Sequence, residues 1–282
     1  LGRREAVPGK NITLEVDSGL QKAAYEALKA APELAERVGG VKWVVGQGVR
    51  GAVAAQDPNT GGILALVSVP SFDPSTIAQD YNLLSNDKNL PLFNRAIGGA
   101  YHPGSIFKIV TTAAAFEDGK IDENFSYIDT GVVTVNNFTY KNWYFTQYGR
   151  TEGEIDTVRA IARSTDTFFY KVGEFVGPER LAFWARKFGL GQDSGVDLPG
   201  EVSGLVPDPE WKLKTKGERW FLGNTYHMAI GQGDVAASPL QVNVMTSVVA
   251  SGGKRCRPKV VQVEQVDQVE QGCEELGIGE ET

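Results

Sequence analysis

One run of residues indicates both the fold and the chemistry of this chain: Tyr101-His-Pro-Gly-Ser-Ile-Phe-Lys-Ile-Val-Thr-Thr-Ala-Ala-Ala-Phe116. Pro103-Gly104 interrupts the backbone, and the apolar run that follows predicts a buried helix that begins at Ser105 and stops at Asp118-Gly119. Residues three apart share a face of a helix, so Lys108 is expected one turn beyond the Ser105 hydroxyl. Burial favours the neutral amine, which can take the proton of the serine and make it nucleophilic.

A purely structural interpretation of the same pair is also open. Serine is a preferred N-cap, and a lysine one turn later can extend its amine into water. The Ser-x-x-Lys spacing also occurs at Ser85, within an Asn-rich stretch that runs into Pro91, and at Ser251, where two glycines lie inside the motif. Glycine opposes a helix, and neither copy is expected to hold its pair on one turn.

A second candidate element is Ser164-Thr165-Asp166, which lies between two predicted helices. Residues 157–163 have an amphipathic pattern, and residues 167–176 are mostly apolar. A loop at such a junction can direct a hydroxyl and a carboxylate into a cleft while packed helices fix both flanks. The other Ser-x-Asp, at Ser71 and Asp73, precedes a proline and is typical of a turn.

With these two motifs in this order, the chain resembles the transpeptidase domain of class B penicillin-binding proteins, most closely the elongation-type enzymes with Asp in the second motif. The resemblance covers nearly the full length. It extends to Asn11-Ile-Thr-Leu-Glu-Val-Asp17, Gly51-Ala-Val-Ala-Ala-Gln-Asp-Pro-Asn-Thr-Gly61, Phe188-Gly-Leu-Gly191, Gly195-Val-Asp-Leu-Pro-Gly-Glu201, Gly231-Gln-Gly233 and Ser238-Pro-Leu-Gln241.

The resemblance implies an α+β fold of the β-lactamase and transpeptidase type. In it, an antiparallel sheet that starts at residues 51–69 packs against helices, and Ser105 lies at the base of a cleft between them. The implied activity is a D,D-transpeptidase that cross-links peptidoglycan stem peptides and binds penicillin. Ser105 would be its nucleophile and Lys108 the base, Ser164 would relay a proton, and Asp166 would hold Lys108 or the substrate amide. No cofactor is implied.

The partners implied by the resemblance are peptidoglycan stem peptides, β-lactams and a polytopic cell-wall glycosyltransferase. The implied location is the outer face of the bacterial cytoplasmic membrane, with an anchor before Leu1. The third motif of the family, Lys-[Ser/Thr]-Gly, does not occur in this sequence, and Lys214-Thr-Lys-Gly217 is no substitute. We therefore expect residues 1–10 to end a linker and residues 11–282 to form a transpeptidase domain that is incomplete at its C-terminal end.

Two other functions stay open at this point. A β-lactam hydrolase shares the Ser-x-x-Lys start, but it needs a second base to activate water, and no suitably placed Glu-x-x-Leu-Asn is present. A non-catalytic penicillin-binding or scaffold module would keep the pocket without turnover, and the missing third motif is its sole support.

Composition narrows the possible partners further. A net charge of -7 gives no support to nucleic-acid binding or to a basic patch for anionic membranes. The longest charge-free stretch, residues 235–253, contains Pro239 and several polar side chains, which favours a buried helix over a membrane span.

Cysteine and histidine counts leave the redox state open and argue against one kind of metal site. Cys256 and Cys273 are compatible with free thiols or with one disulfide, and two histidines do not suffice for a histidine-rich metal site.

Local patterns predict the remaining elements. We expect a helix over residues 20–31 that closes before Pro32, and a β-hairpin of residues 51–56 and 63–69 joined by a turn at 57–62. Residues 71–100 are expected to be rich in loops, and residues 125–150 to be irregular. The aromatic residues between 136 and 148 could line a substrate groove or simply cover the core. Gly231-Gln-Gly233 predicts a tight turn.

Overall fold

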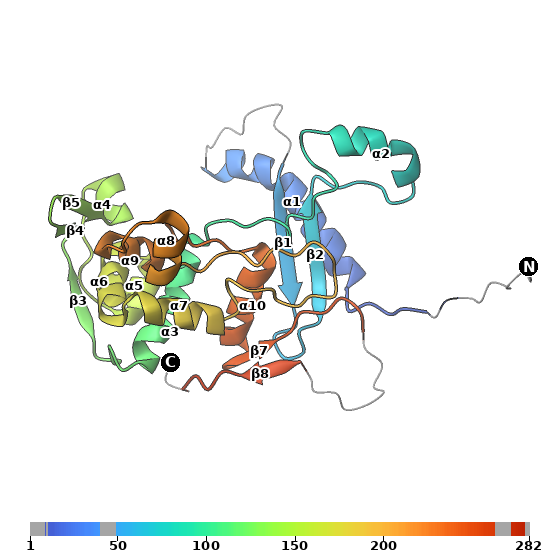
Figure 1. The fold of residues 1–282 in the computed structure, drawn as a ribbon. Helices are drawn as coiled ribbons and strands as arrows, with labels where there is room; N and C mark the ends of the chain where they lie inside the picture. Colours follow the sequence, from blue (N-terminus) through green and yellow to red (C-terminus); the bar gives the residue numbers. More distant parts are fainter. Residues whose placement is uncertain (1–8, 10, 40–48, 263–271, 280–282) are drawn as a thin grey trace, which may run out of the picture.

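The protein has two groups of elements with the helix α10 (Pro239–Ala250) between them (Figure 1). The computed structural model describes residues 9, 11–39, 49–262 and 272–279. Leu240 of α10 lies in a small core with Ile63 and Ile97, whereas Met245 and Val248 lie in a much larger core built from the central helices. Helices combined with antiparallel strand pairs make this an α+β fold, as the sequence predicts.

The predicted hairpin is present at its predicted bounds. β1 (Gly51–Gln56) pairs antiparallel with β2 (Ile63–Val69). Alternate residues of β2 are buried, as expected for a strand with one face on the core. The Asp57 side chain accepts a hydrogen bond of 2.8 Å from the Asn59 main-chain N–H and so stabilises the turn. Within the described ranges this sheet has two strands, and the other strand pairs are separate from it.

The predicted end of the first helix is wrong. α1 (Ser18–Gly39) continues through Pro32 and packs on β2. A proline inside a helix removes one main-chain hydrogen bond. The residues after Pro32 include Leu34, Ala35 and Glu36, which are good helix formers, and they maintain the helical conformation past the missing bond.

Two regions are more regular than the sequence suggests. Residues 71–100 contain α2 (Ile77–Asn86), a short helix with no buried residue. Residues 125–150 contain short elements in place of the expected irregular structure: β3 (Ser126–Asp129), β4 (Val132–Val135), β5 (Phe138–Lys141) and α4 (Trp143–Tyr148). Asn136, with a φ of 53°, starts the tight turn from β4 to β5, and Asn-Asn between apolar residues is the local sequence signal for that turn.

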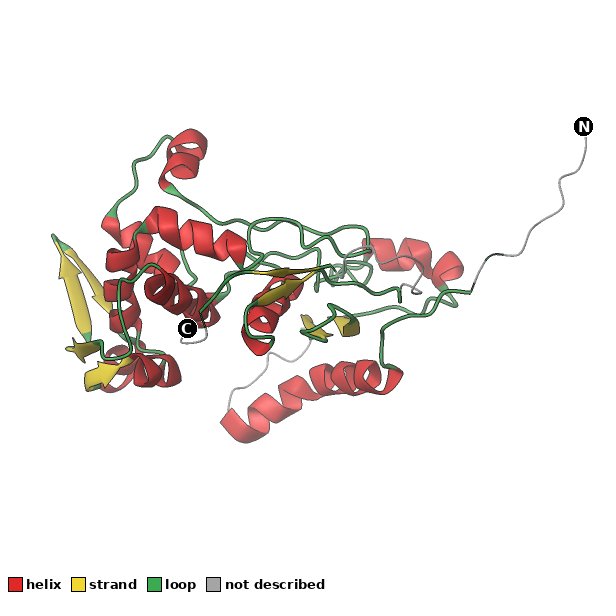
Figure 2. Cartoon of the chain, turned by 90° about the horizontal axis from the view of Figure 1, so that it is seen from below, coloured by secondary structure: helices red, strands yellow, loops and turns green. Residues whose placement is uncertain are grey.

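The larger core is formed mainly by helices. Besides α10, they are α3 (Lys108–Glu117), α5 (Thr157–Arg163), α6 (Asp166–Val176), α7 (Pro178–Lys187) and α9 (Leu222–Ala229). The short helix α8 (Pro209–Lys216) adds no residue to this core. Phe168 and Phe169 of α6 are fully buried there, and truncating such a side chain to alanine typically costs about 3–5 kcal/mol. β3 pairs with β6 (Gly153–Asp156), and these strands lie at one end of the helical group, away from β1 and β2 (Figure 2).

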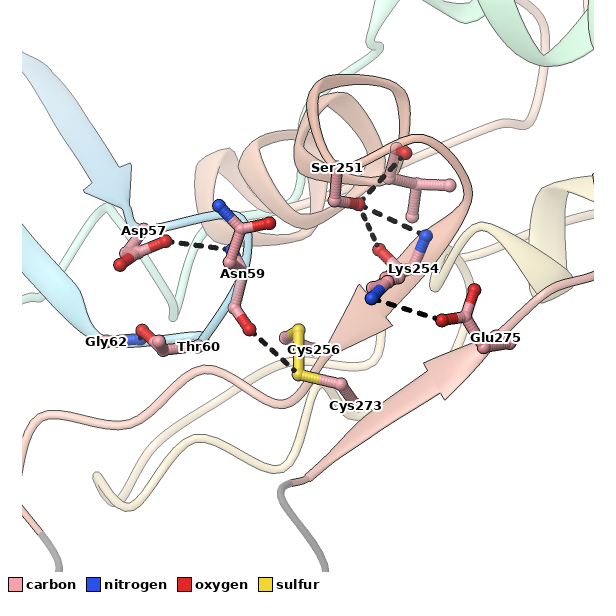
Figure 3. The surroundings of a disulfide bond; sticks show 10 residues. Asp57, Asn59, Thr60, Gly62, Ser251, Lys254, Cys256, Cys273 and Glu275 are labelled. Carbon is pink, nitrogen blue, oxygen red and sulfur yellow. Dashed lines mark hydrogen bonds and ion pairs between the residues drawn. A yellow bond between two sulfur atoms is a disulfide. The ribbon is translucent and has the colours of Figure 1, made fainter. Parts of the chain in front are cut away.

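The last described elements are the strands β7 (Lys254–Cys256) and β8 (Cys273–Glu275). A disulfide joins Cys256 to Cys273, which resolves the alternative left open by the sequence (Figure 3). The predicted linker lies outside the described residues except for residue 9. Helix α10 is buried on the core as predicted for residues 235–253, and no helix in the described ranges combines the length and apolarity needed to cross a bilayer.

Candidate active site

Ser105 lies in a 3₁₀ turn, Gly104–Phe107, that leads directly into α3. The Gly104 N–H donates a 2.8 Å hydrogen bond to the Gly231 carbonyl, so the turn rests on the predicted tight turn at residues 231–233. Gly231 has a φ of 68°, and a Cβ there would overlap the Gly104 carbonyl and the Phe107 side chain. Only glycine permits this close approach, which presents the Ser105 side chain at the surface.

The 3₁₀ geometry aligns Ser105 with Lys108 along the helix. A 3₁₀ turn has three residues per turn, so side chains three apart eclipse one another. The N-cap of the turn is Pro103, so Ser105 lies inside the turn and is not its cap, and Lys108 is 2% exposed. The structural alternative of an N-cap serine with a lysine extended into water is therefore wrong.

The Lys108 ammonium binds the second predicted motif. Its Nζ donates hydrogen bonds to the Ser164 carbonyl at 2.8 Å, to the Ser164 hydroxyl at 3.0 Å and to Asp166 Oδ1 at 2.7 Å. These three acceptors match the three donors of an ammonium group. The structure thus brings together Lys108, Ser164 and Asp166 from segments more than fifty residues apart in the sequence. In the part of the chain that the structure describes, the Lys108 main-chain N–H donates to the Ser105 carbonyl, but no hydrogen bond joins the Ser105 hydroxyl to Lys108 Nζ.

Two features of the surroundings have opposite effects on the pKa of Lys108. Burial lowers the pKa of the ammonium from its ordinary value, while the charge and hydrogen bond of Asp166 oppose that shift. The Nζ also lies 5.1 Å from the centre of the Phe169 ring, whose apolar body excludes water from one side. The net effect is a lysine that gives up its proton more readily than a solvated one.

Ser164 is held in an uncommon backbone conformation. It ends α5 with a φ of 52° and a ψ of 46°, in the left-handed region that non-glycine residues rarely adopt. Its N–H bonds the Ile161 carbonyl and the Thr165 N–H bonds the Ala160 carbonyl, both at 3.0 Å. These bonds keep the chain in the tight turn that directs the carbonyl and the hydroxyl of Ser164 toward Lys108.

Asp166 is fixed by two residues that sequence reasoning did not identify. Its N–H donates to Asn142 Oδ1 and its Oδ2 accepts from the Trp143 N–H, each at 3.2 Å. Asn142 is fully buried and precedes α4, in the aromatic region expected to be irregular. A polar residue in front of an aromatic run was the available signal, but it did not reveal which carboxylate Asn142 would face.

The other Ser-x-x-Lys copies are structural, as expected. Ser85 lies in the last turn of α2, where its hydroxyl bonds the Asn82 carbonyl. Ser251 follows α10, and its hydroxyl bonds main-chain atoms of Lys254, whose amine pairs with Glu275 at 3.2 Å (Figure 3). Both lysines of these copies, Lys88 and Lys254, are exposed.

A cavity of about 470 Å³ lies between the hairpin β4–β5 and α9. Its walls include the aromatic side chains Phe138, Tyr140, Trp220 and Phe221, together with His227. The four predicted site residues do not line it. Tyr140 also packs edge-to-face on the core residues Tyr170 and Tyr226, so the aromatic segment covers the core as well as lining a cavity. Among the described residues no group of three or more His, Cys, Asp or Glu side chains could hold a metal ion.

Comparison with known protein families gives a match over most of the chain. The model of the penicillin binding protein transpeptidase domain matches residues 51–275. The peptidoglycan D,D-transpeptidase MrdA of Acinetobacter baumannii is 35% identical over 269 residues, which is 93% of this chain and 37% of that protein. The chain therefore spans little more than a third of the length of this relative.

Solved structures show the same similarity in three dimensions. Pseudomonas aeruginosa PBP2 in complex with WCK 5153 aligns with a TM-score of 0.79 and 34% identity over 93% of this chain and 57% of that one. A peptidoglycan synthase complex, described as coordinating polymerization and crosslinking, contains a chain with a TM-score of 0.81 and 34% identity over 93% of this chain and 45% of that one. The penicillin G acyl-enzyme complex of penicillin-binding protein A from Mycobacterium tuberculosis aligns with a TM-score of 0.71 and 28% identity. The alignment covers 89% of this chain and 54% of that one. These similarities confirm the resemblance and the fold predicted from it.

Proposed function

Because the chain belongs to the family of penicillin-binding protein transpeptidase domains, we propose that it is the transpeptidase unit of an elongation-type peptidoglycan D,D-transpeptidase. The observation that carries this proposal is a buried lysine, Lys108, that lies one turn from an exposed serine and is bonded to Ser164 and Asp166. That arrangement suits a serine nucleophile and its base. We assign residues 11–282 to this unit and residues 1–10 to a linker.

The reaction starts with neutral Lys108 taking the proton of the Ser105 hydroxyl. The Ser105 oxygen attacks the carbonyl carbon of the D-Ala-D-Ala peptide bond, and a tetrahedral oxyanion forms. The Ser105 main-chain N–H, at the start of a helix, is positioned to donate to that oxyanion. The C–N bond then breaks, the terminal D-alanine leaves with the proton, and the acyl group stays on Ser105. An amine of a second stem peptide then attacks the ester carbonyl and gives up a proton, the C–O bond to Ser105 breaks, and the serine oxygen takes a proton back as the cross-link forms.

In this mechanism Ser164 transfers the proton and Asp166 stabilises the protonated form of Lys108. The Ser164 hydroxyl, 3.0 Å from Lys108 Nζ, relays the proton to the leaving amine. Asp166 holds the amine in place and stabilises its charged form between proton transfers. Whenever Lys108 has accepted a proton, its positive charge is therefore paired with the Asp166 carboxylate.

We further propose that the protein acts on the outer face of the bacterial cytoplasmic membrane, anchored by an N-terminal segment, beside a polytopic glycosyltransferase. Disulfides persist in oxidising compartments, so the bond between Cys256 and Cys273 supports an extracytoplasmic location. The similarity to a chain of a peptidoglycan synthase complex supports a polymerising partner.

Intact-mass spectrometry after incubation with penicillin G tests the proposed function. β-Lactams mimic D-Ala-D-Ala and leave a stable acyl-enzyme, so we expect one penicilloyl adduct. Ser105→Ala should remove it, and Ser85→Ala, at the exposed copy of the motif, should not. An adduct that survives Ser105→Ala would contradict the assignment of the nucleophile.

A further inference from the structure

Asp129, at the end of β3, is a buried carboxylate that this mechanism does not use. It is 1% exposed and accepts four hydrogen bonds: from the N–H groups of Gly131 and Glu152 at 2.8 Å, from Asn142 Nδ2 at 3.1 Å and from Thr167 Oγ1 at 2.7 Å. All four donors are uncharged, and no Lys or Arg in the described ranges forms an ion pair with it. So complete a set of bonds to a buried acceptor fixes the groups that donate to it.

The first of these groups is the amide of Asn142. The oxygens of Asp129 only accept, so the Nδ2 of Asn142 has to face them. Its Oδ1 therefore faces the opposite way, toward the N–H of Asp166 at 3.2 Å. Asp129 thus determines which end of the Asn142 amide is presented to Asp166.

The second group is the hydroxyl of Thr167, the residue directly after Asp166 in α6. Thr167 is fully buried, and its bond of 2.7 Å ties the first turn of α6 to the end of β3. Asp129 therefore holds the backbone of Asp166 from both sides, through Asn142 and through Thr167. Asp166 in turn bonds Lys108 at 2.7 Å.

We propose that Asp129 is a positioning residue for this site: it holds Asn142 and Thr167, and through them it sets the Asp166 carboxylate against Lys108. The strand pair β3–β6 thereby becomes part of the support of the site, since the Glu152 N–H just before β6 also bonds Asp129. The kinetic consequence rests on the proposed function, whereas the geometric consequence does not.

Asp129→Asn tests the proposal with almost no change in shape. Its new amide NH₂ would face donors, so the Asn142 amide has to turn and set its own NH₂ against the N–H of Asp166. We expect penicillin acylation to fall about 10-fold to 100-fold, because small misplacements of reacting groups have effects of this size. Weaker contact with Asp166 also favours neutral Lys108, so the acid limb of the rate profile should move to lower pH.

Asp156→Asn is the matched control, since it makes the same change at the end of β6. The Asp156 side chain caps α5 by accepting from the Arg159 N–H at 2.7 Å, and asparagine caps equally well. Rate and pH profile should stay as in the wild type. Asn142→Asp, added to Asp129→Asn, restores an acceptor for the Asp166 N–H and should recover part of the lost rate, which a general loss of stability would not allow.

Crystal structures separate this inference from the proposed function. If the wild type forms no penicilloyl adduct, the function fails, but the Asp129→Asn structure still decides the geometry. A turned Asn142 and a Lys108–Asp166 distance longer than 2.7 Å support the proposal; an unchanged arrangement, or unchanged acylation in a folded variant, overturns it. Should Asp129→Asn not fold, the near-isosteric Thr167→Val must displace Asp166 in the same way, and an unmoved Asp166 there would also overturn the proposal.

Discussion

Two Ser-x-x-Lys pairs of this molecule have the same spacing and opposite surroundings. Lys108 is 2% exposed and directs its amine into three hydrogen bonds with residues of another helix junction. Lys254 is exposed and pairs with Glu275, itself largely in solvent, while the hydroxyl of Ser251 bonds the adjacent main chain (Figure 3). The four-residue pattern is therefore only a spacing. Burial and the partner supplied by a distant segment distinguish a candidate base from a surface lysine.

The largest expected difference between the two pairs is in acylation. Lys108→Met removes the proposed base while keeping an apolar stem in the buried site, and general base catalysis typically contributes about 10²-fold to 10⁴-fold. Penicillin acylation of Ser105, followed by stopped-flow or mass spectrometry, should slow by that order. Lys254→Met should leave the rate within about twofold. Equal losses in the two variants would show that the contrast in burial has no catalytic meaning.

Replacing the carboxylate that pairs with each lysine gives a sharper comparison, because the pH dependence of acylation should change at one pair only. Asp166 raises the pKa of Lys108 against the dominant lowering by burial, so Asp166→Asn should lower that pKa further. Because the neutral amine is the active form, the acylation rate rises as pH passes the Lys108 pKa, and the acid limb should move to lower pH. Glu275→Gln, the matching change at Lys254, should not move the limb. A limb that stays in place in Asp166→Asn would mean that the carboxylate does not act on the base.

The same contrast shows how far sequence reasoning reached. Local rules were enough for the hairpin at residues 51–69 and for both helices around Ser164, because apolar periodicity and turn residues specify them. They failed for β3 to β5, whose strands have four residues each and little burial. The contact between Lys108 and Asp166 spans 58 residues, so only the resemblance anticipated it. Asn142 and Asp129 were missed because no local pattern shows which distant segment a buried polar residue will contact.

The disulfide near the second pair should act on stability alone. It links residues separated by 17 positions, and loops of this length are associated with stabilisation of about 3 kcal/mol. Replacing Cys256 and Cys273 together with alanine should lower the free energy of unfolding by roughly 2–4 kcal/mol, measured by denaturant or thermal unfolding. Penicillin acylation of folded protein should not change, because among the described residues no side-chain hydrogen bond or ion pair joins β7 or β8 to Lys108 or Ser164. Slower acylation without a loss of stability would instead indicate that the region of β7 and β8 supports the site.

The smallest effect is expected at Ser251 itself. Its hydroxyl lies 2.8 Å from the Lys254 carbonyl and 3.1 Å from the Lys254 N–H, so it closes a short turn after α10. A hydrogen bond of this kind contributes about 0.5–1.5 kcal/mol, and both backbone groups of Lys254 can bond water once the hydroxyl is removed. Ser251→Ala should therefore lower stability by no more than about 1 kcal/mol and leave acylation unchanged.

The opposite result is expected at Ser105, whose side chain makes no hydrogen bond within the described residues. Ser105→Ala should keep the melting temperature of the wild type and form no penicilloyl adduct. If Ser105→Ala instead destabilised the protein more than Ser251→Ala, the exposed serine would have a structural role, and the distinction between the two pairs would fail.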